Sequence, residues 1–247
     1  IKISPNYADA YNNMGLALKE KGDVNAALKS FKKALKFKPN YAEAYNNIGL
    51  ILNSKGDLES AIQSYKKALN IKPIYSEAYN NMGIAFTSQG DLENALESFK
   101  QALKIKSDYA EAFVNMGNAL QGNGELEAAI KSYKQALKIK PDYADAYFNM
   151  GVALQDKGYL KAALDSFTIG LKIKPDDQKY RSQKLHLQAR MCDWIGVREE
   201  EVLISELGTT TQHIVPGTML ALEDAPDRHR LRSEIYSNQT FKQTPLP

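Results

Sequence analysis

Side-chain amides recur at a fixed interval along the chain and are its most regular polar feature. Asparagine occupies one position in each of five consecutive 34-residue stretches: Asn13, Asn47, Asn81, Asn115 and Asn149. The preceding position adds Asn12, Asn46 and Asn80, and then changes to Val114 and Phe148. A carboxamide both donates and accepts hydrogen bonds, as a peptide backbone does. The pattern therefore indicates binding chemistry, in which a row of amides holds an extended polypeptide by its backbone.

A second interpretation of these amides is structural. The asparagines would then tie neighbouring helices together, or would persist because the units arose by recent duplication. Replacing Asn47, Asn81 and Asn115 by alanine separates the two interpretations, because only the binding interpretation predicts that less extended peptide is captured.

Residues typical of catalysis or metal binding form no recognisable set. His186, His213 and His229 do not stand at metal-ligand spacing from Cys192 or from acidic residues. The glycines lie at repeated positions and form no phosphate-binding loop. The sequence also contains no serine-centred nucleophile motif. We therefore expect that this chain is not an enzyme and holds no metal or cofactor.

Composition limits the class of protein and of partner. Hydrophobic residues make up 43% and charged residues 25% of the chain, which indicates neither disorder nor a membrane span. The formal net charge of +3 is too balanced to predict a nucleic-acid partner. A single cysteine excludes an internal disulfide and favours a reducing compartment, so cytoplasm is expected.

The 34-residue period defines the elements that carry the amides. It predicts five units with the bounds 8–41, 42–75, 76–109, 110–143 and 144–177. Within each unit, positions 4 and 24 are aromatic, position 8 is glycine and position 20 is alanine. The two small residues let two helices approach closely, and the aromatic rings fill the space around them. Each unit is thus predicted to pair helix A, over positions 1–14, with helix B, over positions 17–30.

Turn and cap residues mark the ends of these helices. A glycine suited to a left-handed helix end recurs at Gly22, Gly56, Gly90, Gly124 and Gly158. Asp23, Asp57 and Asp91 follow and are predicted to cap helix B. Proline at position 32 stops helix B in four units, whereas Ser107 in the third unit is expected to loosen that turn. Gly170 stands where other units have alanine and is expected to weaken its helix by about 1 kcal/mol.

Charged residues also repeat. Position 2 is always acidic: Asp9, Glu43, Glu77, Glu111 and Asp145. Asn6, Asn40, Asp108 and Asp142 lie three residues earlier, which favours a capping box at the start of helix A; a groove that selects basic clients is the alternative. The lysines of helix B are interpreted as a solvated face, with a patch for anionic ligands as the alternative: Lys32, Lys33, Lys36, Lys66, Lys67, Lys134 and Lys138.

The spacing and residue types of the five units resemble the tetratricopeptide repeat family. This resemblance implies an all-α fold, a right-handed α-solenoid of helix-turn-helix repeats, in which helix A lines a concave groove. The amides would then form a ladder along that groove. Neighbouring inner helices about 10 Å apart correspond to about three residues of extended chain. The expected partners are extended polypeptides, with no nucleic acid and no membrane.

The segments outside the five units have separate interpretations. Residues 1–7 are predicted to be the remnant of a preceding repeat, because Ile3-Ser4-Pro5-Asn6-Tyr7 restates the sequence from Ile139 to Tyr143. Residues 178–207 are predicted to form degenerate capping helices, as the ends of solenoids require. Residues 208–247 are predicted to be a transition segment toward a catalytic region that this chain lacks.

Two features resemble one branch of the family, the protein O-glycosyltransferases of the O-GlcNAc transferase and SPINDLY type. One is the run Ala-Tyr-Asn-Asn-Met-Gly at Ala10–Gly15 and Ala78–Gly83, and the other is Cys192-Asp193-Trp194 with the segment from Met219 to Pro247. The resemblance implies that the chain recruits clients for a glycosyltransferase. Because Ile214–Gly217 departs from the His-rich stretch of animal members, a bacterial or SPINDLY-like member is expected. A free-standing scaffold is the alternative.

Overall fold

The chain is all-α in the part that a computed structural model describes, residues 6–191 and 193. This part contains eleven helices and no strand. The helices are α1 (Asn6–Glu20), α2 (Val24–Phe37), α3 (Ala42–Ser54), α4 (Leu58–Ile71), α5 (Ser76–Gln89), α6 (Leu92–Ile105), α7 (Ala110–Gly122), α8 (Leu126–Ile139), α9 (Ala144–Asp156), α10 (Leu160–Ile173) and α11 (Gln178–Arg190). The predictions for residues 1–5, for Cys192 and for residues 194–247 lie outside the described residues.

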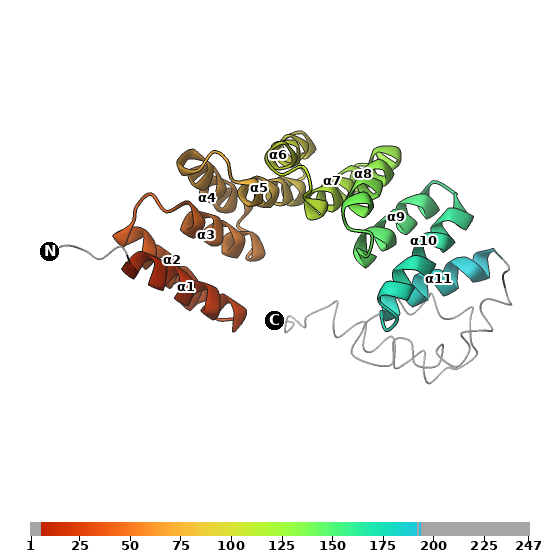
Figure 1. Cartoon of the computed structure of the whole chain (residues 1–247), viewed down its shortest axis with the longest axis horizontal. Coiled ribbons are helices and arrows are strands. Elements are labelled where there is room, and N and C mark those ends of the chain that lie inside the picture. The colour runs from red at the N-terminus through yellow and green to blue at the C-terminus, as the bar shows by residue number, and fades with distance from the viewer. Residues whose placement is uncertain (1–5, 192, 194–247) are drawn as a thin grey trace, which may run out of the picture. The chain divides into compact units, whose positions relative to one another are not determined.

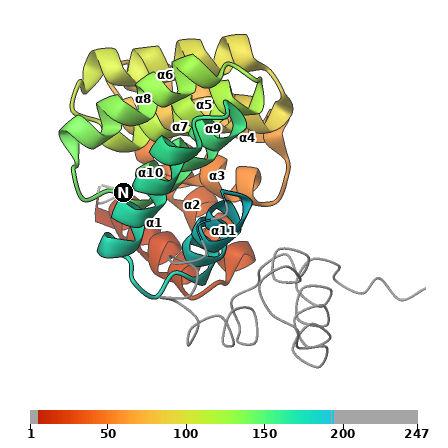
Figure 2. The same ribbon diagram turned by 90° about the vertical axis from the view of Figure 1, so that its right-hand side faces the viewer.

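The chain divides into two compact units, Ile1–Ile139 and Lys140–Pro247. In the first unit each odd-numbered helix packs against the helix that follows it, which gives four helix pairs. In addition, α2 contacts α3, α4 contacts α5 and α6 contacts α7, and α5 contacts both α3 and α7. The A helices of this unit therefore lie side by side in one layer (Figure 1). In the second unit α10 packs against α9 and α11, as Figure 2 shows from a second direction.

Within each pair, a glycine faces a buried ring. A Cβ atom added at Gly15, Gly49, Gly83, Gly117 or Gly151 would lie 2.5–2.7 Å from the aromatic ring of helix B. Those rings are fully buried: Phe31, Tyr65, Phe99, Tyr133 and Phe167. The predicted combination of a small residue in helix A and an aromatic residue in helix B is therefore confirmed in all five pairs.

The turns between the paired helices follow the predicted chemistry. The glycine in each turn has φ between +80° and +83°, a conformation that residues with a Cβ rarely adopt. The carboxylates of Asp23, Asp57 and Asp91 accept hydrogen bonds at 3.0–3.2 Å from the backbone N–H groups three residues later. Both predictions are confirmed.

The predicted capping box of helix A is wrong. The residues at the N-cap are Tyr41, Tyr75, Tyr109 and Tyr143, and none of them caps its helix with its side chain. Helix A starts one residue later than a capping box requires, so Asn40, Asp108 and Asp142 precede the N-cap. The acidic residues do lie in the first turn, where they complement the helix dipole.

The buried aromatic residue of helix B is tyrosine in two pairs, at Tyr65 and Tyr133, and the hydrogen bonding of the two hydroxyl groups differs. The Tyr133 hydroxyl lies 2.9 Å from Asn118 Oδ1 and 2.8 Å from Gln121 Oε1 and donates to one of them. The Tyr65 hydroxyl is buried with no hydrogen-bond partner, and its burial raises the pKa of the phenol.

The substitutions Tyr65→Phe and Tyr133→Phe are therefore expected to differ in effect. Tyr133→Phe should lower the free energy of unfolding by about 1 kcal/mol, because it removes a hydrogen bond. Tyr65→Phe should leave it unchanged or raise it, because it removes an unpaired buried hydroxyl. Urea unfolding followed by circular dichroism measures both, and an equal loss for the two variants would contradict this assignment.

The turn at Ser107 keeps the geometry of the proline-containing turns. The N–H of Lys106 donates to Ala102 O at 2.9 Å, as Lys38 and Lys72 do to their alanines in the first two pairs. Lys106 has φ −130° and ψ 93°, the extended conformation that a residue before proline adopts. The expected loosening is therefore not seen.

Because that turn is already compatible with proline, Ser107→Pro should raise the free energy of unfolding by about 0.4–1 kcal/mol through a smaller entropy of the unfolded chain. The measurement is a shift of the thermal midpoint. Ser107→Ala serves as the control, since alanine does not restrict φ. An equally large rise of the thermal midpoint for the alanine variant would refute the entropic explanation.

Gly170 continues helix α10 without a break. A Cβ at this position would meet its nearest neighbours, Ala144 O, Tyr147 Cβ and Tyr180 Cδ2, at 3.6 Å, which is ordinary contact. Gly170→Ala should therefore raise the free energy of unfolding by about 0.5–1 kcal/mol, the helix propensity difference. A loss of stability in urea unfolding would show that the site is tighter than its contacts indicate.

Candidate functional site: an asparagine ladder

The asparagines of neighbouring A helices are joined in pairs. Asn47 Nδ2 donates to Asn12 Oδ1, Asn81 Nδ2 donates to Asn46 Oδ1, and Asn115 Nδ2 donates to Asn80 Oδ1. All three distances are 3.0 Å, and each bond joins residues 35 apart in sequence. In α3, α5 and α7 the position-6 amide is thus held by the position-5 amide of the A helix before it.

The two members of each pair differ in burial. The acceptors Asn12, Asn46 and Asn80 are only 5–6% exposed. Among the donors, Asn47 is buried, whereas Asn81 and Asn115 are half-buried. Asn149 is half-buried in the second unit, and Asn13 is exposed. The position-5 side chains thus support the position-6 side chains, which lie nearer the surface.

The structural interpretation of the amides is therefore confirmed for three pairs, because they tie neighbouring helices together. This role does not exhaust the hydrogen-bonding capacity of the donors. A carboxamide has two N–H bonds and an oxygen with two lone pairs, and the tie uses one N–H. Binding of a client by the remaining groups stays a prediction.

The ladder changes character where position 5 is no longer asparagine. Val114 offers no hydrogen-bond acceptor, and Phe148 instead stacks on Tyr180 of α11 in the second unit, with ring centroids 4.3 Å apart and planes at 11°. Tyr180 also donates a hydrogen bond to Asp145. Aromatic packing against α11 thus takes the place of amide pairing in that unit.

Two of the five acidic residues at position 2, Glu43 and Asp145, form ion pairs within their own helix pairs. Lys72 Nζ lies 2.9 Å from Glu43 Oε1, and Lys174 Nζ lies 2.8 Å from Asp145 Oδ1. Burial by itself would raise the pKa of Glu43, but the hydrogen bond and charge of Lys72 hold that pKa below its ordinary value. These partners weaken the alternative in which the acids select basic clients.

The lysine that ends helix B also covers a tyrosine ring. Lys38, Lys72, Lys106 and Lys140 each place Nζ 4.2–4.7 Å from the centroid of the tyrosine three residues later. Such cation–π contacts contribute about 0.5–1 kcal/mol at exposed sites. They help to stabilise the turn between repeats.

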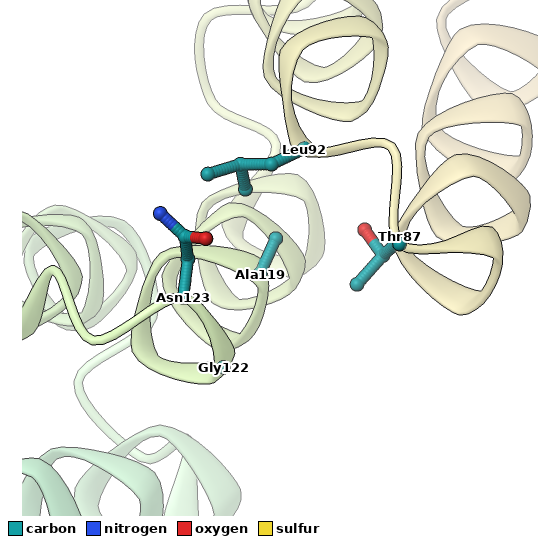
Figure 3. A pocket seen from close by; sticks show the side chains of 6 residues that line it. Thr87, Leu92, Ala119, Gly122 and Asn123 are labelled. Atoms are coloured by element: carbon teal, nitrogen blue, oxygen red, sulfur yellow. The ribbon is translucent and has the colours of Figure 1, made fainter.

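A small hollow of about 170 Å³ lies at the ends of helices α5 and α7 (Figure 3). Its polar side chains have internal partners: the Thr87 hydroxyl donates to Gly83 O at 2.9 Å, and Asn123 Nδ2 donates to Glu125 Oε1 at 3.0 Å. Its lining contains neither an acid nor a base. The hollow therefore has no groups for catalysis.

No group of three or more His, Cys, Asp or Glu residues in the described part of the chain could hold a metal ion. Of the three histidines, His213 and His229 lie outside that part. None of the described helices is long and apolar enough to cross a membrane.

The geometry defines a class: helix pairs repeated at 34 residues and stacked as an α-solenoid, with a row of amides on helix A. The TPR repeat family pattern matches residues 15–53, 49–88, 84–124 and 122–158, and the tetratricopeptide repeat pattern matches residues 144–177. The chain belongs to the tetratricopeptide repeat (TPR) family. It is a protein–protein interaction module of that kind.

Solved structures agree with this assignment. MamA is 30% identical, with 67% of this chain and 97% of that chain covered and a TM-score of 0.58. PilF of Pseudomonas aeruginosa is 17% identical over 96% of this chain and 98% of its own, with a TM-score of 0.72. YrrB, described as a TPR protein with an unusual peptide-binding site, is 24% identical over 68% and 86%, with a TM-score of 0.53. No curated protein matches the chain.

Proposed function

We propose that the layer of A helices in the first unit is a concave surface that binds extended polypeptide clients through the position-6 amides. The observation that carries this proposal is the repeated hydrogen bond of 3.0 Å from the amides of Asn47, Asn81 and Asn115 to their buried supports. The bond fixes the plane of the amide, so its carbonyl oxygen and second N–H have one orientation. Groups ordered before binding lose less entropy when a client binds.

The spacing of the amides suits a peptide backbone. Neighbouring packed helices are about 10 Å apart, which is about three residues of an extended chain. Amides at this spacing would contact every third peptide unit and leave the client side chains to the rest of the groove. Recognition through main-chain hydrogen bonds tolerates many client sequences.

Backbone N-methylation tests this mode of recognition directly. Three unrelated unstructured peptides of 15 residues are compared with versions that are N-methylated at every second residue, using fluorescence anisotropy. N-methylation removes an N–H donor and keeps the side chain, and contacts three residues apart alternate between odd and even positions, so the peptide cannot avoid the methyl groups by sliding. The proposal therefore predicts weaker binding of each methylated peptide, and equal affinity for methylated and unmodified peptides would show that recognition does not use the backbone.

We further infer, from sequence alone, that the chain serves as the client-recruiting arm of a protein O-glycosyltransferase. The inference rests on the similarity of Cys192-Asp193-Trp194 and of residues 219–247 to that family. Sequencing the gene beyond the codon for Pro247 tests it, and two Rossmann-like lobes are expected there. Their absence would leave the free-standing scaffold, for which the TPR fold by itself is sufficient. A bacterial source and a cytoplasmic location belong to the same proposal.

A further inference from the structure

A second candidate binding surface lies between helices α6 and α8, over helix α7. This α6–α8 groove has a volume of about 290 Å³. Leu96 of α6 and Met116 and Leu120 of α7 give it an apolar lining, with Ala128 of α8 beside them. Two exposed lysines complete it: Lys100 on α6 and Lys131 on α8. The groove is therefore apolar in its depth and cationic at both sides.

The same place in the preceding repeat has a different character. At a shift of 34 residues, Glu97 stands in place of Lys131 and Asn94 in place of Ala128. Glu97 accepts a hydrogen bond from Gln101 at 2.7 Å, and Asn94 Nδ2 donates to Asp91 at 2.7 Å. Met82, the counterpart of Met116, is buried at 9% exposure, whereas Met116 is half-buried. The α6–α8 groove is thus more open and more basic than its counterpart.

The groove is separate from the asparagine ladder. Asn115 and Met116 are consecutive in α7, and consecutive helix residues point about 100° apart. Asn115 is engaged with Asn80 of α5, whereas Met116 lines the space between α6 and α8. An occupant of this groove would therefore not compete for the ladder amides.

We propose that the α6–α8 groove binds an acidic peptide segment that inserts one large apolar side chain between flanking carboxylates. The volume of about 290 Å³ lies just below the roughly 300–1,000 Å³ of small-molecule sites, so it suits one or two side chains. The apolar lining takes the inserted side chain, and Lys100 and Lys131 pair with carboxylates on either side of it. One part of the lysine-rich surface of helix B thus has a binding role. The assignment rests on charge complementarity and on the volume of the α6–α8 groove.

Methyl NMR of the full chain labelled with ¹³C at the methionine methyl groups tests the proposal. The probe is a synthetic peptide, acetyl-Glu-Asp-Glu-Phe-Asp-Glu-Asp-amide, titrated to about 1 mM, a concentration that detects even weak binding. The Met116 signal should shift and the Met82 signal should not. A peptide with serine in place of phenylalanine, and one with lysine in place of every acid, should each cause at most a tenth of that shift.

Two variants locate the interaction. Lys100→Glu/Lys131→Glu should weaken binding of the acidic peptide at least tenfold, whereas Lys32→Glu/Lys66→Glu makes the same charge change on α2 and α4 and should keep affinity within twofold. Ala128→Leu fills the groove without a charge change and should also weaken binding at least tenfold. No shift of Met116 up to 1 mM, or an equal loss in the α2 and α4 control, would overturn the proposal. Because Asn115 remains intact in every variant, failure here leaves the proposed function of the ladder untouched.

Discussion

Gly83→Ala is expected to lower the free energy of unfolding by about 2 kcal/mol. The new Cβ would lie 2.7–2.9 Å from three atoms of the Phe99 ring, which is fully buried and cannot swing into solvent. Overpacking of this kind costs typically about 1–3 kcal/mol, and contacts this short place the site at the upper end. The higher helix propensity of alanine returns about 1 kcal/mol. The clash therefore outweighs the gain in propensity.

Comparing the unfolding free energies of Gly83→Ala and Gly170→Ala separates the clash from helix propensity. Both substitutions place alanine in a helix, but only the first brings Cβ within 3 Å of another atom. Urea unfolding should show opposite signs for the two. Combining Gly83→Ala with Phe99→Leu should reduce the cost of the alanine, because the two residues are in contact and their effects are coupled. Equal effects for the two alanines would mean that helix propensity alone controls position 8.

Much of the fold could be predicted because its signals are local and repeated. The bounds predicted for helix B, positions 17–30, match all five B helices in full: α2, α4, α6, α8 and α10. The bounds predicted for helix A, positions 1–14, match α5 in full and the other four A helices within two residues. A glycine with positive φ ends each A helix, and the chain offers that glycine five times. A single such signal would be weak. Five copies at the same spacing reinforce one another and fix the period.

The first residue of helix A was predicted correctly in α3, α5, α7 and α9, but its N-cap was not. The spacing from Asp108 to Glu111 fits a capping box, but the helix begins after Tyr109. Tyr109 is the N-cap, and its ring lies under Lys106, with Nζ 4.7 Å from the centroid. That contact depends on the three-dimensional turn, and no local sequence rule contains it.

The hydrogen-bond partners of the amides likewise could not be predicted from the sequence. The repeat pattern placed Asn46 and Asn81 on equivalent helices, but a period does not reveal that they bond to each other. The bonded residues are 35 apart, one more than the period, and this pairing follows from how the helices are stacked. The replacement of this pairing by the stacking of Phe148 on Tyr180 is also a property of packing.

The pairing changes how the binding role has to be tested. Asn81→Ala would remove a candidate contact to the client and would also leave Asn46 Oδ1 buried without its partner, at a cost of about 1–3 kcal/mol. Replacing Asn47, Asn81 and Asn115 together would repeat that cost three times. A loss of binding in that variant could therefore come from unfolding.

Replacing both members of a pair avoids the orphaned acceptor, because loss of both partners is close to neutral for stability. The informative variant is Asn46→Val/Asn80→Val/Asn81→Ala/Asn115→Ala. Its matched control is Asn46→Val/Asn80→Val, which carries at position 5 the valine that the chain itself has at Val114. Both variants lack the two ties, and only the control keeps the amides of Asn81 and Asn115. Thermal unfolding should show both to be folded.

The dissociation constant of an extended peptide for these two proteins, measured by fluorescence anisotropy, tests the central claim most directly. Two lost hydrogen bonds at about 0.5–1.5 kcal/mol each predict binding about 5- to 150-fold weaker for the four-substitution variant than for its control. The control itself should bind less tightly than the unaltered chain, because its amides are no longer held in one orientation. Equal dissociation constants for the control and the four-substitution variant would contradict the account, and the asparagines would then serve only to tie the helices together.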